Sequence, residues 1–166
     1  MKKRYIIAIL IVVIIAILTF NFLNGLDYAH CEEYSIKIPE GLEIPHGSYQ
    51  YQTDKVHTIS LTTGLVEAGE HYRNLDLSTV PLENLPNTNN MSIAEDYTEG
   101  DLKVVKGQVN DGYYYGGDNV TFAEFDKDGK HFYLVIDSPW DMDLEDINLN
   151  DDVKLIKEIK ESIKFN

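Results

Sequence analysis

Residues Val120–Ile136 read VTFAEFDKDGKHFYLVI and carry the clearest structural signal in the chain. Two runs rich in aromatic and β-branched residues flank Asp128-Gly129, a residue pair that favours a tight turn between strands. The sequence therefore predicts a β-hairpin. Its second run, His131–Ile136, is almost continuously apolar, which is typical of a central strand covered on both faces.

Shorter alternating runs outside the hairpin predict further strands. Polar and apolar residues alternate in Tyr34–Ile38, His57–Thr63 and Leu102–Val109, and each run is followed by Pro, Gly or Asn. A period of two is typical of a strand with one buried face. Residues 65–77 are ambiguous, with a partly helical segment as one interpretation, and residues 78–90, with two prolines and several asparagines, predict a loop.

Two helices are expected beside these strands. Ser92–Glu95 has the spacing of a capping box and predicts a short helix, while Asp151–Phe165 is amphipathic. The apolar stripe of the second segment consists of Leu155, Ile156, Ile159 and Ile163. The predicted fold class is therefore α+β, an antiparallel sheet with packed helices, in an exported domain spanning residues 34–166.

The uncharged run from Tyr5 to Leu23 predicts a single transmembrane helix (5–23), because it is long enough to cross a hydrocarbon core of about 30 Å. Lys2–Arg4 precede the run and Asp27 is the first charge after it. The positive-inside rule then places a basic tail (1–4) in the cytoplasm and a juxtamembrane spacer (24–33) with the domain outside. The expected localisation is the cell membrane, with a single-pass signal-anchor. A cleaved signal peptide is the alternative.

Composition limits the partners. The 166 residues carry a net charge of −14, and all 28 acidic residues follow the apolar run, so we expect no nucleic-acid binding. The single cysteine, Cys31, excludes an intrachain disulfide, so the domain must be held together by its hydrophobic core. We expect a free thiol or an intermolecular bridge at this residue.

Aromatic residues are the first candidates for a binding site. Tyr113, Tyr114 and Tyr115 lie between glycines, and Trp140 follows in an irregular acidic segment. Tyrosine rings combine stacking area with a polar tip, which suits a surface protein or a glycan as partner. An ordinary strand is the alternative interpretation of the tyrosines.

An acidic run offers oxygen ligands of the kind that calcium prefers. The candidate ligands are Asp141, Asp143, Glu145 and Asp146, and a solvated acidic loop is the alternative. Asn90 and Asn119 each begin an Asn-x-Ser/Thr sequon for glycosylation. The five histidines show no zinc-ligand spacing, and no catalytic motif or cofactor is predicted.

Three segments resemble small PsbP-like exported domains, which include short membrane-anchored proteins of unknown function from methanogenic archaea. They are the YSIKIPEGL stretch at Tyr34–Leu42, the turn at Lys127–Lys130 and the closing Ser162–Phe165. The resemblance covers residues 34–165, except for residues 65–96, which match no such motif. It implies an antiparallel sheet sandwiched by helices and no catalytic residue.

The function predicted from the sequence is that of a membrane-anchored, extracytoplasmic binding or accessory module of unknown ligand. PsbP-like domains mostly act in this way, so the resemblance favours a module of this class over an enzyme. The alternative is a small exported hydrolase or a metal-dependent enzyme with an unrecognised site. A cleft that gathers histidine or carboxylate side chains with a bound metal would favour the enzyme, and an exposed aromatic patch with no buried polar cluster would favour the module.

Overall fold

The computed structural model describes residues 11–15, 27–45, 55–63, 73–81, 91–110, 119–138 and 142–166. Within these ranges lie ten strands, the 3-10 helix η1 (Leu144–Asp146) and the α-helix α2 (Leu149–Ser162), and residues 11–15 are also helical. The strands are β1 (Tyr28–His30), β2 (Tyr34–Lys37), β3 (Leu42–Glu43), β4 (Thr58–Thr63), β5 (Asn74–Ser78), β6 (Met91–Glu99), β7 (Leu102–Val109), β8 (Asn119–Lys127), β9 (Lys130–Asp137) and β10 (Lys164–Phe165).

The strands form two antiparallel sheets. Seven of them make the larger sheet in the order β3-β4-β5-β9-β8-β7-β6, and β1, β2 and β10 make a smaller one. The predicted hairpin is confirmed as β8 and β9, whose turn residues Asp128 and Gly129 both have positive φ, as a type I′ turn requires. The prediction that the second run is a central strand is also confirmed, because β9 lies between β5 and β8.

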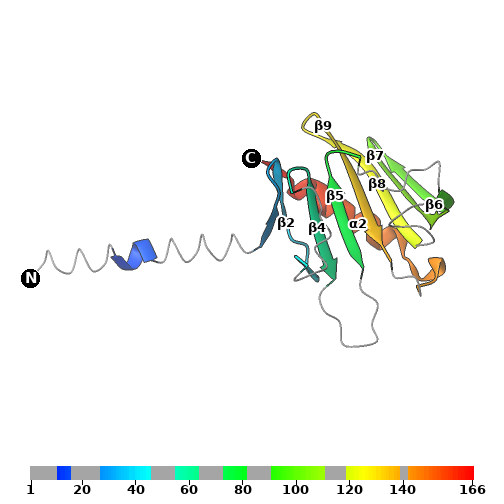
Figure 1. Ribbon diagram of the computed structural model, residues 1–166, viewed down its shortest axis with the longest axis horizontal. Coiled ribbons are helices and arrows are strands. Elements are labelled where there is room, and N and C mark those ends of the chain that lie inside the picture. Colours follow the sequence, from blue (N-terminus) through cyan, green and yellow to red (C-terminus); the bar gives the residue numbers. More distant parts are fainter. Residues whose placement is uncertain are drawn as a thin grey trace, which may run out of the picture.

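Helix α2 packs on one face of the larger sheet (Figure 1). Its residues Ile156 and Ile159 are fully buried in a core that includes Phe125 and Phe132, whose rings stack with centroids 5.4 Å apart. The Asn148 side chain caps the helix by accepting a hydrogen bond from the Asn150 amide. The predicted apolar stripe is therefore confirmed, although Leu155 is only partly buried and Ile163 is buried just beyond the helix.

The smaller sheet joins the same core through β2. Tyr34 is fully buried, its ring meets Phe132 edge-on, and its hydroxyl donates to the Leu77 carbonyl at 2.7 Å. Because β1 pairs with β2, the fold begins earlier than the predicted boundary at residue 34. Part of the expected spacer, 24–33, is thus a strand of the domain.

The α+β prediction is wrong. Among the described residues the protein is mostly β, with two antiparallel sheets and only two short helices in the domain. The expected helix at Ser92–Glu95 is the first part of β6, where pairing with β7 overrides the local capping signal. In the ambiguous region 65–77, where a partly helical segment is one interpretation, the structure instead places most of β5, between β4 and β9 in the larger sheet.

The transmembrane prediction is also contradicted. No helix in the described part of the chain is long and apolar enough to cross a membrane. Of the predicted span 5–23, the structure describes residues 11–15, which are helical, and the other residues lie outside the described ranges. This finding overturns the single-pass signal-anchor topology, the membrane as a partner through that helix, and the cell-membrane localisation.

Candidate functional site

The predicted aromatic site falls outside the described residues. Tyr113, Tyr114 and Tyr115 lie in the gap between β7 and β8, and Trp140 lies in the gap after β9. Their role in binding a surface protein or a glycan stays a prediction.

The predicted calcium ligands that the structure describes are exposed and lie at η1. Asp143 precedes this helix, and Glu145 and Asp146 belong to it, while Asp141 lies outside the described residues. Within the ranges that the structure covers, no group of three or more His, Cys, Asp and Glu residues is arranged to hold a metal ion. The described members of this set are therefore not brought together into a site.

The remaining sequence candidates have structural contacts where the structure describes them. Asn119 begins β8, and its side-chain nitrogen, the atom that a glycan would occupy, donates to the Met142 carbonyl at 2.8 Å. Asn90 lies outside the described ranges. The Cys31 thiol is free and buried, it contacts the Tyr34 carbonyl, and burial raises its pKa. A buried thiol of raised pKa is a poor candidate for an intermolecular bridge.

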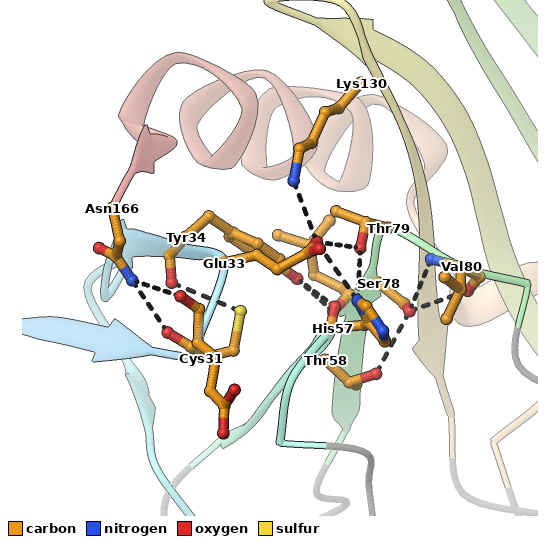
Figure 2. Close-up of polar contacts among 12 residues, drawn as sticks. Cys31, Glu33, Tyr34, His57, Thr58, Ser78, Thr79, Val80, Lys130 and Asn166 are labelled. Atoms are coloured by element: carbon orange, nitrogen blue, oxygen red, sulfur yellow. Dashed lines mark hydrogen bonds and ion pairs between the residues drawn. The ribbon is translucent and has the colours of Figure 1, made fainter.

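One polar cluster, which we call the Glu33 junction, consists of Glu33, His57, Thr79 and Lys130. Its members come from the turn between β1 and β2, the residue before β4, the residue after β5 and the first residue of β9. Figure 2 shows their polar groups converging on the Glu33 carboxylate. The junction therefore joins the smaller sheet to the larger one.

Three side chains contact the Glu33 carboxylate through one oxygen, Oε2. The Thr79 hydroxyl donates to it at 2.7 Å, Lys130 Nζ lies at 3.2 Å and His57 Nδ1 at 3.3 Å. The hydrogen bond from Thr79, with those from His57 and Lys130, lowers the pKa of Glu33 from 4.5 to about 2. Glu33 is therefore a carboxylate at neutral and mildly acidic pH.

This arrangement does not resemble a nucleophilic triad. In a triad the imidazole separates the hydroxyl from the carboxylate and takes the hydroxyl proton. Here the Thr79 hydroxyl donates directly to Glu33, and both lie near the same imidazole nitrogen, His57 Nδ1. A carboxylate with a pKa of about 2 is also a poor general base at neutral pH. The geometry is that of a structural polar contact between the two sheets.

A second polar cluster fixes the first turn of α2 on the larger sheet. Arg73 donates to both carboxylate oxygens of Asp152, at 2.6 and 2.9 Å, and to the Ser138 hydroxyl at 3.0 Å. The Thr121 hydroxyl also donates to Asp152, which is 2% exposed. A buried carboxylate held by a bidentate arginine is a structural contact, because its oxygens already have strong donors.

The outer side of β6 is the longest strand edge that no described strand pairs. β6 runs for nine residues at the end of the larger sheet, and no described strand pairs with its outer side. A two-residue turn at Gly100 connects β6 to β7, so the pair that flanks it, Glu99 and Leu102, is hydrogen-bonded. From that pair onward, opposite residues in an antiparallel ladder alternate between hydrogen-bonded and non-hydrogen-bonded pairs. The backbone N–H and C=O groups of Asp96 and Thr98 therefore point away from β7.

A bulge limits the regular part of this strand. The register shifts between Ile93 and Glu95, so the undistorted segment is Glu95–Glu99. We call the outer side of this segment the β6 edge. Apart from half-buried Tyr97, its side chains are exposed. The β6 edge is thus a five-residue template for backbone pairing.

Carboxylates dominate the side chains of the β6 edge. Glu95 forms an ion pair with buried Lys106, and Glu99 forms one with Lys157 of α2. The hydrogen bond from Lys157 lowers the pKa of Glu99. The edge carries Glu95, Asp96 and Glu99 and no basic residue, while the lysines lie on the neighbouring strand and on the helix.

Sequence reasoning missed both the Glu33 junction and the β6 edge. Members of the junction are far apart in the sequence, and Glu33 falls in a predicted spacer. The alternation in Asn74–Ser78 was a usable signal, because it marks β5 and places Thr79 at its end. β6 offered no apolar period, since most of its side chains on both faces are exposed.

No protein-family model, curated protein or solved structure matches the chain. The resemblance to PsbP-like domains stays a prediction from the three quoted motifs. The function is therefore inferred from the geometry of the chain's own residues.

Proposed function

We propose that the chain is a binding module that accepts an extended segment of a partner protein as an added strand at the β6 edge. The observation that carries the proposal is the outward direction of the backbone groups of Asp96 and Thr98 on the last strand of the sheet. Main-chain hydrogen bonds to such an edge supply affinity, and adjacent side chains supply specificity.

The shape of the β6 edge also fits this role. Natural proteins commonly protect exposed edges with charges and bulges, and β6 has both. The bulge lies on one side of the regular segment, however, and leaves Glu95–Glu99 undistorted for five residues. The acidic side chains of this segment repel other acidic strands, while pairing with a strand of opposite charge stays favourable.

The alternative, a small hydrolase or metal-dependent enzyme, has less support. The Glu33 junction and the Arg73–Asp152 cluster are the polar clusters with the most side-chain contacts that we find in the described ranges, and both join structural elements. Their carboxylates are already engaged by strong donors. The β6 edge, in contrast, has backbone groups that no described strand pairs.

A proline substitution tests strand addition. Thr98→Pro removes an outward-pointing N–H and leaves the bonded pairs with β7 in place, while Thr98→Val is the matched control that keeps the N–H. Random ten-residue peptides displayed on phage are selected on the wild-type chain and then tested on both variants. We expect the selected peptides to bind wild type and Thr98→Val and to lose binding to Thr98→Pro. Equal binding to a folded Thr98→Pro variant, with native circular dichroism, would refute the proposal.

A further inference from the structure

The side chains of the β6 edge select among the segments that could pair with it. Glu95, Tyr97 and Glu99 alternate along the strand and share the face that α2 covers, where Lys106 and Lys157 contact the two glutamates. These lysines lie inward from β6. An added strand would lie on the other side and would meet the carboxylates first.

A second copy of the chain is disfavoured by these charges. If two copies paired through their β6 edges around a two-fold axis at Tyr97, the outward-pointing backbone N–H and C=O groups of Asp96 and Thr98 would all form hydrogen bonds. This register places Glu95 of each copy opposite Glu99 of the other, and like charges directly opposite one another are destabilising. Moving the axis to Asp96 places the two Asp96 side chains opposite each other instead.

We propose that the occupant is an extended cationic segment of another protein with the pattern basic–x–apolar–x–basic, an inference that rests on the proposed strand addition. Residues four apart on a strand share a face, so two Lys or Arg residues at this spacing meet Glu95 and Glu99. The apolar residue between them meets the ring of Tyr97. The pattern reads the same in both directions, so it fits parallel and antiparallel pairing.

Two further features of the molecule favour this occupant. The regular segment between the bulge and the turn is five residues long, which matches the length of the pattern. The net charge of −14 attracts cationic segments over the whole surface and raises their rate of encounter. The net charge also disfavours acidic segments, which the edge carboxylates would repel.

Two defined peptides test the inference on the full chain. Fluorescein-labelled TKTVTKT carries the proposed pattern, and TETVTET is its charge-reversed control, with binding followed by fluorescence anisotropy. We expect TKTVTKT to bind about tenfold more tightly or better, and Glu99→Gln to weaken its binding about 2–5-fold. Glu158→Gln, on an exposed position of α2, should leave binding unchanged, and Thr98→Pro should abolish it.

The outcomes separate this inference from the proposed function. Equal binding of both peptides, lost in Thr98→Pro, would overturn the cationic pattern and leave strand addition standing. Binding of TKTVTKT that survives Thr98→Pro would refute strand addition and show only general charge attraction. Failure of both peptides to bind would overturn the pattern, and the peptide selection then decides strand addition by itself. Self-association in sedimentation velocity that Thr98→Pro abolishes would identify a second copy as the occupant.

Discussion

Replacing Glu33 by Gln removes the charge that the Glu33 junction surrounds. The fall in the pKa of Glu33 from 4.5 to about 2 corresponds to at most about 3 kcal/mol of stability. The Glu33 side chain is 27% exposed, so solvent screening reduces the expected contribution to about 1–2 kcal/mol. We therefore expect Glu33→Gln to lower the free energy of unfolding at pH 7 by about 1–2 kcal/mol.

The pH dependence gives this prediction its sign. The pKa of Glu33 is lower in the folded protein than its ordinary value, so the stabilisation is fully present above pH 4.5 and is lost as the pH falls through about 2. Urea unfolding of wild type and Glu33→Gln, followed by circular dichroism at several pH values from 7 downward, measures the difference. The difference in unfolding free energy between the two proteins should decrease steadily below pH 4.5.

The exposed neighbour Glu32 provides the matched control for the Glu33 junction. Glu32→Gln removes the same charge from the adjacent position and should leave the unfolding free energy nearly unchanged. If wild type and Glu33→Gln have the same unfolding free energy at pH 7, or if their difference stays constant as the pH falls toward 2, the junction does not stabilise the fold through the Glu33 charge.

Three further substitutions test the core and the sheet by thermal and urea unfolding. Ile159→Ala should cost about 2–5 kcal/mol because Ile159 is fully buried on the inner face of α2; a loss within error would mean that the helix is not docked. Asp152→Asn should cost about 3–5 kcal/mol because it leaves Arg73 without its carboxylate partner, and an unchanged melting temperature would refute that role. Gly107→Ala should cost about 1–3 kcal/mol, since a Cβ there would lie 2.4 Å from the Ser92 carbonyl oxygen beside the bulge; wild-type stability would show that the bulge relaxes freely.

Local sequence signals were reliable where one element determines its own structure. The Asp128-Gly129 turn with its apolar flanks specified a hairpin, and the stripe through Ile156 and Ile159 specified an amphipathic helix. Each signal lies within a short window, so it does not depend on distant parts of the chain.

The fold class and the candidate site depend on distant contacts. β6 has few buried side chains and forms through backbone pairing with β7, so the capping-box spacing of Ser92–Glu95 wrongly predicts a helix start. The Glu33 junction unites positions 33, 57, 79 and 130, which only the sheet order brings together. Whether a strand lies at the end of a sheet depends on the order of all the strands, so no residue pattern within β6 predicts its position at the edge.

Amide hydrogen exchange at the β6 edge tests strand addition most directly. The exchange rates of individual amides in the full chain are measured by NMR with and without saturating TKTVTKT. Strand addition predicts slower exchange at Asp96 and Thr98, whose N–H groups point outward, and little change at Tyr97, whose N–H faces β7. Unchanged exchange at Asp96 and Thr98 in the presence of bound peptide, or protection confined to another part of the sheet, would contradict the proposal.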